Sequence, residues 1–171
     1  SCKKAGIKPI IGCEVYVAAR TRFDKDPERD RGMFHLILLA ENMTGYKNLT
    51  KIVSIGFTEG FYFKPRVDKE VLREHSEGII CLSACLAGAI PRKILGGDYS
   101  GAEAEAIELQ EIFGKDNFFL EIQNHFLDED KAVTEGLVKL AKEIGAPLVA
   151  TYDAHYIKRS DAKAHDVLLA I

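Results

Sequence analysis

The sequence predicts an α/β fold of the barrel type, on the basis of two observations. First, roughly five apolar, strand-like runs alternate with helix-like segments along the chain, as in folds that pack helices around a largely parallel sheet. Second, the apolar run that follows Gly145 and Pro147 ends abruptly at Asp153 and His155. In such folds, the carboxyl end of a strand is where ligands bind. A chain of 171 residues with 47% hydrophobic residues suits a single domain with a substantial core.

Composition excludes several classes of function. The formal net charge is −3, which gives no global electrostatic reason to bind nucleic acid, so any DNA contact must be local. No apolar run approaches the roughly 20 residues that span a bilayer, so we expect no membrane association and a cytoplasmic location. The four cysteines do not have the close pairing of a metal finger, and they fit reduced intracellular thiols better than a disulfide framework.

The first segments contain a candidate ligand. Residues 1–6 are typical of a helix end, with lysines in the last turn and Gly6 at the stop, so the chain is expected to be a fragment. Residues 7–17 form an apolar strand candidate interrupted by Glu14. A buried carboxylate is costly unless it is paired, hydrogen-bonded or bound to metal. The alternative is an outward-facing Glu14 on a half-exposed strand.

A highly charged loop comes next. Residues 20–32 contain nine charged residues, five basic and four acidic, so we expect a solvated, mobile loop without a dedicated phosphate site. The apolar run 33–40 has His35 near its start. For His35 to lie near Glu14, this run must return antiparallel to the first strand, as a hairpin with a charged tip. The alternative role for His35 is a core or edge histidine.

The middle of the chain alternates helices and strands. Residues 44–56 predict a helix, and Arg66 in the following loop is a candidate phosphate contact, although pairing with Asp68 is an equal alternative. Residues 78–83 predict a short buried strand, followed by Cys85 at a strand–helix junction. A helix N-terminus can lower the pKa of such a thiol and favour a metal thiolate. Alternatively, Cys85 is a small buried hydrophobic residue.

The last third of the chain contains two further helix–strand units. Ser100 and Glu103 fit a capping box that starts an amphipathic helix. A strand follows over residues 118–122, with Glu121 and His125 near its end as candidate hydrogen-bond partners of metal ligands or as substrate contacts. Asp128 is expected to cap the next helix, which ends at Gly145. A final helix is expected to begin at Ser160 or Asp161.

Asp153 and His155 end the run that begins at Leu148. Residues two apart on an extended chain point to the same side, so these two side chains can converge on one ion. The alternative is that Asp153 caps the next turn and His155 is a hydrogen-bonded surface residue.

Five stretches resemble, in the same order, the PHP (polymerase and histidinol phosphatase) domain of bacterial DNA polymerase III alpha subunits. The resemblance spans nearly the whole chain. The stretches are GIKPIIGCEVY at 6–16, HLILLAEN at 35–42, GFYFKPRVD at 60–68, LSACLAG at 82–88 and DAKAHDVLL at 161–169, together with the final TYDAH at 151–155.

The resemblance implies a distorted seven-stranded (β/α)7 TIM-like barrel. It also implies that residues 1–171 are a single partial domain that lacks an N-terminal strand–helix–strand segment with further ligands. The implied metal ligands here are Glu14, His35, Cys85, Asp153 and His155. Imidazole, carboxylate and thiolate together suit Zn²⁺, with Mn²⁺ or Fe²⁺ as alternatives, and two or three ions are expected in the complete domain.

Three functions are compatible with the resemblance. The first is a replicative polymerase subunit whose PHP site is a metal-dependent 3′–5′ exonuclease or phosphoesterase, with Glu14, Asp153 and His155 acting through the metal. The second is a metal-stabilised module that docks a separate proofreading exonuclease. The third is a stand-alone phosphatase resembling histidinol phosphatase. The implied partners are DNA, dNTPs, a sliding clamp and a clamp loader. The residues for nucleotide addition, with their Mg²⁺, lie outside this chain.

Overall fold

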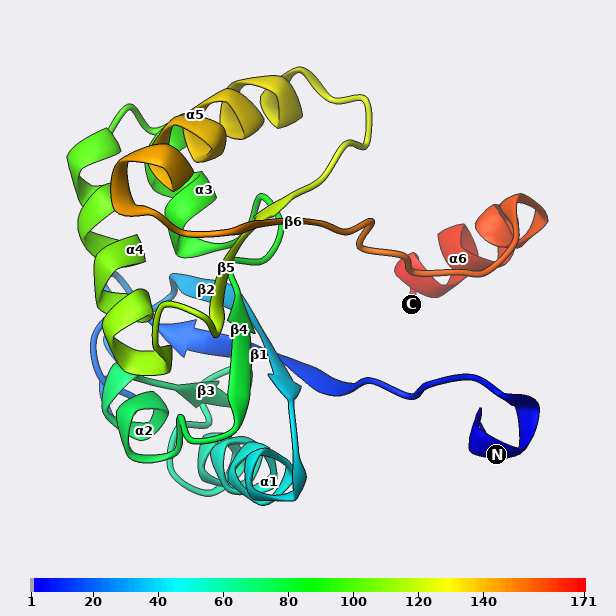
Figure 1. Cartoon of the computed structure of the whole chain (residues 1–171), viewed down its shortest axis with the longest axis horizontal. Helices are drawn as coiled ribbons and strands as arrows, with labels where there is room; N and C mark the ends of the chain where they lie inside the picture. The colour runs from blue at the N-terminus through cyan, green and yellow to red at the C-terminus, as the bar shows by residue number, and fades with distance from the viewer. Residues whose placement is uncertain (1) are drawn as a thin grey trace.

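The fold is built on a curved mixed sheet with most of its helices on one side (Figure 1). The computed structural model describes residues 2–171. Within this range the sheet contains β1 (Ile11–Ala18), β2 (Met33–Ala40), β3 (Arg66–Val67), β4 (Ile79–Leu82), β5 (Phe118–Ile122) and β6 (Leu148–Ala150). The helices are η1 (Cys2–Ala5), α1 (Met43–Thr58), α2 (Lys69–Glu74), α3 (Ala89–Leu95), α4 (Tyr99–Phe113), α5 (Asp128–Ile144), η2 (Arg159–Asp161) and α6 (Ala162–Leu169).

The strand order is β3-β1-β2-β4-β5-β6, and β2 alone runs opposite to the others. The β1–β2 hairpin that the sequence predicts is confirmed, with Glu14 opposite Ile37 and Tyr16 opposite His35. Because β2 is reversed, its beginning lies at the same sheet edge as the carboxyl ends of the parallel strands. His35 therefore lies at the edge where ligands bind in α/β proteins.

The alternation of side chains along the hairpin separates the core from the candidate site. Val15 and Val17 on β1, with Leu36 and Leu38 on β2, are buried in one apolar cluster with residues from α1, α4 and α5. Burial of this face is the main driving force for the fold. Successive strand residues point to opposite faces, so Glu14 and His35 point away from that cluster.

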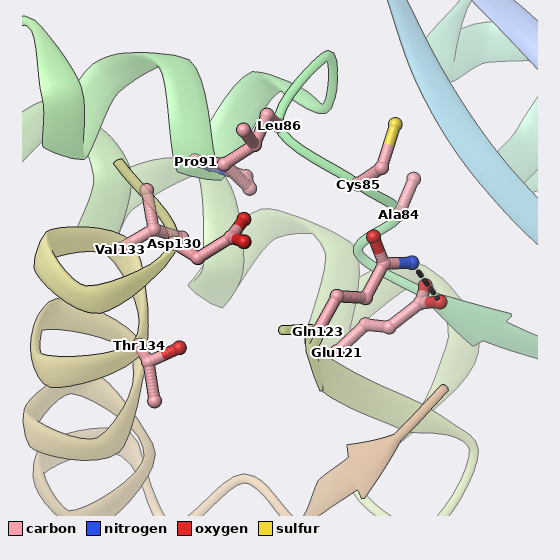
Figure 2. A pocket seen from close by; sticks show the side chains of 9 residues that line it. All are labelled: Ala84, Cys85, Leu86, Pro91, Glu121, Gln123, Asp130, Val133 and Thr134. Atoms are coloured by element: carbon pink, nitrogen blue, oxygen red, sulfur yellow. Dashed lines mark hydrogen bonds between the residues drawn. The ribbon is translucent and has the colours of Figure 1, made fainter. Parts of the chain in front are cut away.

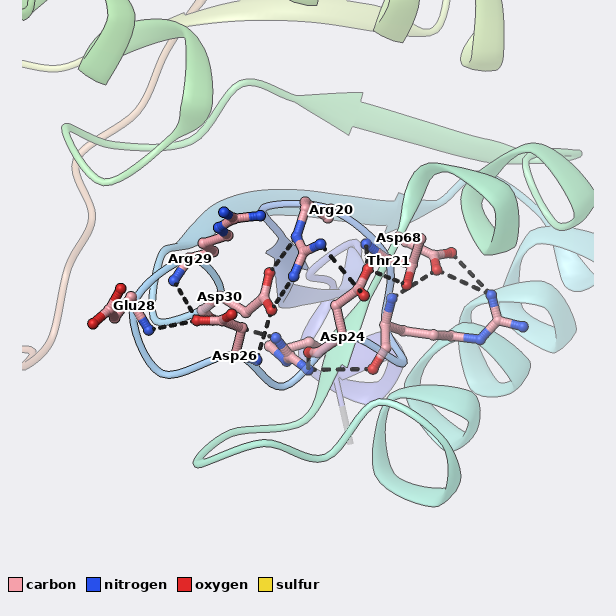
Figure 3. A network of polar contacts seen from close by, with 10 residues as sticks. Arg20, Thr21, Asp24, Asp26, Glu28, Arg29, Asp30 and Asp68 are labelled. Carbon is pink, nitrogen blue, oxygen red and sulfur yellow. Dashed lines mark hydrogen bonds and ion pairs between the residues drawn. The ribbon is translucent and has the colours of Figure 1, made fainter.

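The charged segment 20–31 is largely exposed, as expected of a solvated loop, and ion pairs and hydrogen bonds connect several of its residues (Figure 3). Asp30 is buried and accepts hydrogen bonds from Arg20 Nε at 2.9 Å and Nη2 at 2.6 Å. Arg22 pairs with Asp68, which also caps α2 by accepting from the Val71 amide. The charges of this segment therefore pair with one another and with Asp68.

Arg66 is fully buried and forms hydrogen bonds with the same segment. Its guanidinium donates hydrogen bonds to backbone carbonyls, namely those of Arg22, Asp24, Asp30 and Gly60. These contacts occupy the guanidinium N–H groups that would otherwise donate hydrogen bonds to a phosphate. The suggestion that Arg66 binds phosphate, or pairs with Asp68, is therefore wrong in this structure.

Two helix starts differ from the sequence-based predictions by one or two residues. Asp98, not Ser100, caps α4 by accepting from the Gly101 amide at 3.0 Å. At α5, Asp128 is already the first helical residue, and the carboxylate of Asp130 instead accepts from the Leu127 amide. In both cases a neighbouring carboxylate competes for the free amides of the first turn.

The last strand is shorter and more exposed than expected. β6 ends at Ala150, and both Leu148 and Ala150 are exposed. Within residues 2–171 the sheet is open, with β3 and β6 at its edges, so a closed barrel does not form in this part of the chain. The two termini extend from the side of the sheet opposite the helices (Figure 1). At the N-terminus, η1 and the left-handed Gly6 agree with the predicted helix end. Ser1 lies outside the described residues.

Candidate metal centre

His35 lies between two other potential metal ligands. Its Nδ1 atom is 3.1 Å from Oε1 of Glu14 and 3.8 Å from Sγ of Cys85. The imidazole is held in this position by the Tyr16 ring, which packs edge-on at a centroid distance of 5.0 Å. The backbone N–H of His35 also donates to the carbonyl of Ala87 at 3.2 Å. The structure thus brings together three donors that the sequence places 21 and 50 residues apart.

Cys85 belongs to the loop between β4 and α3. Ala84 before it adopts a left-handed φ of 64°, which turns the chain sharply toward β2. Burial raises the pKa of the Cys85 thiol, and the negative charges of Asp153 and Glu14 raise it further. Burial and the neighbouring carboxylates therefore outweigh any lowering of the thiol pKa by the helix N-terminus. A cation bound between these groups would instead lower the pKa of the thiol, because a positive charge favours the thiolate.

Asp153 and His155 lie in the loop that follows β6, at the same sheet edge. The idea that an extended backbone points both side chains to one side is wrong, because Asp153 has a left-handed φ of 47°. His155 Nδ1 is 2.8 Å from the backbone oxygen of Asp153, and its ring lies 5.5 Å from that of His165. Asp153 is near enough to Cys85 for its charge to raise the thiol pKa.

The predicted ligands are only partly assembled. Among residues 2–171, no three side chains of the His, Cys, Asp and Glu types are gathered closely enough to hold one ion. Glu14, His35 and Cys85 are neighbours, whereas Asp153 and His155 belong to a separate loop. The donor chemistry of the first three fits Zn²⁺, which accepts nitrogen, sulfur and oxygen ligands.

Glu121 and His125 take part in a neighbouring polar cluster at the end of β5. Glu121 is buried, and its Oε1 accepts from the Gln123 side-chain amide at 3.0 Å and from the Thr151 hydroxyl. His125 Nε2 is 3.2 Å from the carbonyl oxygen of Tyr152, directly before Asp153. These contacts link the end of β5 to the loop that contains Asp153.

Three residues of the site were not identified from the sequence. They are Tyr16, which orients His35, together with Gln123 and Asp130, which complete the polar cluster. A signal existed for Tyr16, because it lies two residues after Glu14 on the same strand face. Asp130 gave no such signal, since an acidic residue in the first turn of a helix is ordinary.

The structure contains no helix long and apolar enough to cross a membrane among the residues it describes.

Comparison with known proteins identifies the family of the chain. A model of the PHP domain family matches residues 1–125. The DNA polymerase III subunit alpha of Treponema pallidum is 50% identical over 171 residues, covering 99% of this chain and 15% of the relative. The subunit of Thermus aquaticus is 52% identical over 168 residues, covering 97% of this chain and 14% of the relative. The chain thus spans about 15% of the length of these relatives, and it belongs to the PHP domain family.

Proposed function

We propose that this chain is part of the PHP domain of a bacterial DNA polymerase III alpha subunit, a DNA-directed DNA polymerase. The supporting observation is the roughly 50% identity that extends over the whole chain to proteins of that name. DNA, dNTPs and replication partners such as a proofreading exonuclease, a sliding clamp and a clamp loader would engage the complete subunit. Its Mg²⁺-dependent nucleotide addition would use residues outside this segment.

Within this segment, we infer a metal centre with phosphoesterase or 3′–5′ exonuclease activity. Glu14, His35 and Cys85, which are neighbours but not close enough in this structure to hold one ion, would supply ligands together with Asp153 and His155 from the loop after β6. A bound Zn²⁺, or Mn²⁺ or Fe²⁺, would supply Lewis-acid activation of water toward a phosphoester. Tyr16 would keep the imidazole of His35 oriented, as outer partners of metal ligands generally do.

The complete domain would then be a distorted seven-stranded barrel. The open edges at β3 and β6 support this proposal, because unpaired strand edges need a partner or a cover. The missing strand–helix–strand segment would add the remaining ligands, and the complete domain would bind two or three ions in total.

An interaction module is the second candidate. Phe126, Leu127 and Tyr152 are exposed around a cavity of about 730 Å³ between the end of β5, α5 and β6. Exposed apolar side chains grouped in this way are typical of surfaces that bind other proteins. In this alternative, the metal orders the loops, and the surface docks a separate proofreading exonuclease.

The test uses the full-length subunit and measures bound metal by mass spectrometry together with hydrolysis of a 3′-labelled primer. We expect bound ions and chelator-sensitive cleavage. Asp153→Asn should abolish cleavage while circular dichroism stays unchanged. The control is Asp116→Asn, which changes an acidic residue in the turn before β5, far along the chain from the candidate ligands.

Bound ions without cleavage in any of these proteins would favour the interaction module. An absence of bound ions in the unmodified subunit would contradict the ligand assignment itself.

A further inference from the structure

The loop that contains Asp153 is attached to the end of β5 residue by residue. The backbone N–H of Thr151 donates to a carbonyl of β5 at 3.1 Å, and its hydroxyl donates to Oε1 of Glu121. One residue later, Nε2 of His125 lies 3.2 Å from the carbonyl oxygen of Tyr152. Because a carbonyl oxygen only accepts hydrogen bonds, Nε2 carries the proton of this contact.

His125 is itself held at its backbone and at its ring. Its backbone N–H donates to Oδ2 of Asp130 at 2.6 Å, and its ring packs against that of Tyr152 at a centroid distance of 5.9 Å. Asp130 is buried in the first turn of α5, across a small cavity from Glu121 and Gln123 at the end of β5 (Figure 2). The imidazole therefore reaches the Tyr152 carbonyl from a junction that both β5 and α5 hold in place.

The Tyr152 carbonyl controls the direction in which Asp153 points. The peptide group that joins these two residues is planar, so the position of its oxygen fixes the plane from which the Asp153 side chain departs. Asp153 has a left-handed φ of 47°, which is costly for a residue other than glycine and persists only where the surroundings impose it.

Other contacts of the loop do not fix this peptide plane. Those of Thr151 lie two residues before Asp153, and the backbone dihedral angles between them can still rotate. Nδ1 of His155 lies 2.8 Å from the carbonyl oxygen of Asp153, which belongs to the following peptide group. The hydrogen bond from His125 is thus the contact that holds the peptide group directly before Asp153.

We propose that His125 is a positioning residue that sets where Asp153 enters the metal centre. This inference rests on the metal centre of the proposed function, because it concerns one of the expected ligands. Burial raises the pKa of the Cys85 thiol, and the charge of Asp153 adds to this effect, so the loop already brings its carboxylate toward Cys85. Without the hydrogen bond to the Tyr152 carbonyl, Asp153 leaves its left-handed conformation and its carboxylate changes direction.

Two substitutions of His125 separate its contact with Tyr152 from its other contacts. In His125→Gln, the side-chain amide nitrogen occupies the same place along the side chain as Nε2 of histidine and can donate to the same carbonyl. In His125→Asn, the amide nitrogen lies one bond nearer the backbone and stops short of that carbonyl. Both variants lose the ring and keep the backbone N–H that donates to Asp130. The His125 side chain is 29% exposed, so both variants should fold, which circular dichroism checks.

Crystal structures of the full-length subunit, treated with a chelator, test the positioning without any metal. We expect residues 151–155 of His125→Gln to superimpose on those of the unmodified subunit, and Asp153 of His125→Asn to lose its left-handed φ. An unchanged loop in His125→Asn would overturn the proposal. A loop displaced equally in both variants would also overturn it, because the ring and not the hydrogen bond would then hold the loop.

The affinity for Zn²⁺, measured by competition with a chromophoric chelator, gives a second test on the same proteins. We expect His125→Asn to weaken Zn²⁺ binding about tenfold or more, as changes to residues that orient metal ligands do. His125→Gln should bind nearly as tightly as the unmodified subunit. The control is His75→Asn, the same substitution at the end of α2 and outside the ligand set, which should leave the affinity unchanged.

The two measurements separate the failure of this inference from that of the metal centre. Equal Zn²⁺ affinities in His125→Asn and His125→Gln would overturn the positioning role. If the unmodified subunit binds no Zn²⁺, the ligand assignment of the proposed function fails, and the crystal structures alone decide whether His125 positions the loop.

Discussion

At the residue scale, Arg66 shows how a buried charge can order a polar segment. Its guanidinium donates to carbonyls that belong to the segment 20–31 and to Gly60, and the side chain is wholly inaccessible to solvent. Lysine is also cationic, but it lacks the planar array of donors that reaches several acceptors at once. We therefore expect Arg66→Lys to lower the free energy of unfolding by about 3 kcal/mol or more. Urea denaturation followed by circular dichroism measures this change.

The matched control for Arg66→Lys is Arg73→Lys. The Arg73 side chain is 53% exposed and pairs with Glu108 at 2.7 Å. Because surface ion pairs contribute little, this substitution should change stability by about 0.5 kcal/mol or less. Similar losses in both variants would show that the buried carbonyl contacts of Arg66 do not stabilise the fold.

Asp30 gives a prediction for pH dependence at the same scale. The hydrogen bonds from Arg20 hold the pKa of the Asp30 carboxyl below its ordinary value, and the backbone N–H of Asp26 acts in the same direction. A group with a lowered folded-state pKa stabilises the protein above its unfolded-state pKa, which is about 3.9, and loses this effect as the pH falls through the folded value. The unmodified chain should therefore melt above Asp30→Asn at pH 6, and the difference should shrink below about pH 4.

Thermal melts between pH 2.5 and pH 6 test this prediction for Asp30. Glu28→Gln is the control, because Glu28 is exposed on the same segment and its carboxylate accepts no hydrogen bond in the described part of the chain. A difference between the unmodified chain and Asp30→Asn that stays constant across this range would show that titration of Asp30 is not linked to folding.

At the element scale, the start of α1 depends on a single side chain. Oδ1 of Asn42 accepts from the backbone N–H of Gly45 at 3.0 Å, which satisfies one of the free amides of the first turn. Asn42→Ala should destabilise the protein by about 1 kcal/mol, whereas Asn42→Asp should be nearly neutral, because both Asn and Asp cap helices well. Urea midpoints measure both changes. A neutral alanine variant would contradict the role of this cap.

Elements with strong local patterns could be predicted from the sequence, and the others could not. The β1–β2 hairpin follows from two apolar runs around a charged tip, and α1 follows from the spacing of its buried residues. The end of β6 could not be predicted, because an apolar run looks the same whether or not a neighbouring strand covers it. The exact caps at Asp98 and Asp130 were also missed, since several nearby carboxylates compete for the same amides.

Local sequence patterns also predict only part of the candidate site. The approach of Glu14, His35 and Cys85 to one another follows from strand pairing, which the hairpin and its register supply. The distance between these residues and Asp153 depends on a loop with a left-handed backbone at that residue, and no local pattern in the sequence encodes it. Likewise, the burial of Arg66 depends on carbonyls that lie far away in the sequence.

At the scale of the whole molecule, the proposed metal centre would join the N-terminal hairpin to the loop after β6. Any ligand that binds only the folded state raises its stability, by about 2.7 kcal/mol when the free concentration is 100 times the dissociation constant.

If Asp153 closes onto Glu14, His35 and Cys85, Zn²⁺ should raise the melting temperature of the unmodified chain. It should raise that of Asp153→Asn less, and that of His35→Ala least, because His35 lies between Glu14 and Cys85. Replacing His165 with alanine serves as the control, since His165 lies on α6 and contacts the rings of His155 and Tyr156 without belonging to the ligand set. Equal Zn²⁺-induced shifts in all four proteins would mean that zinc stabilises the fold through residues outside this centre.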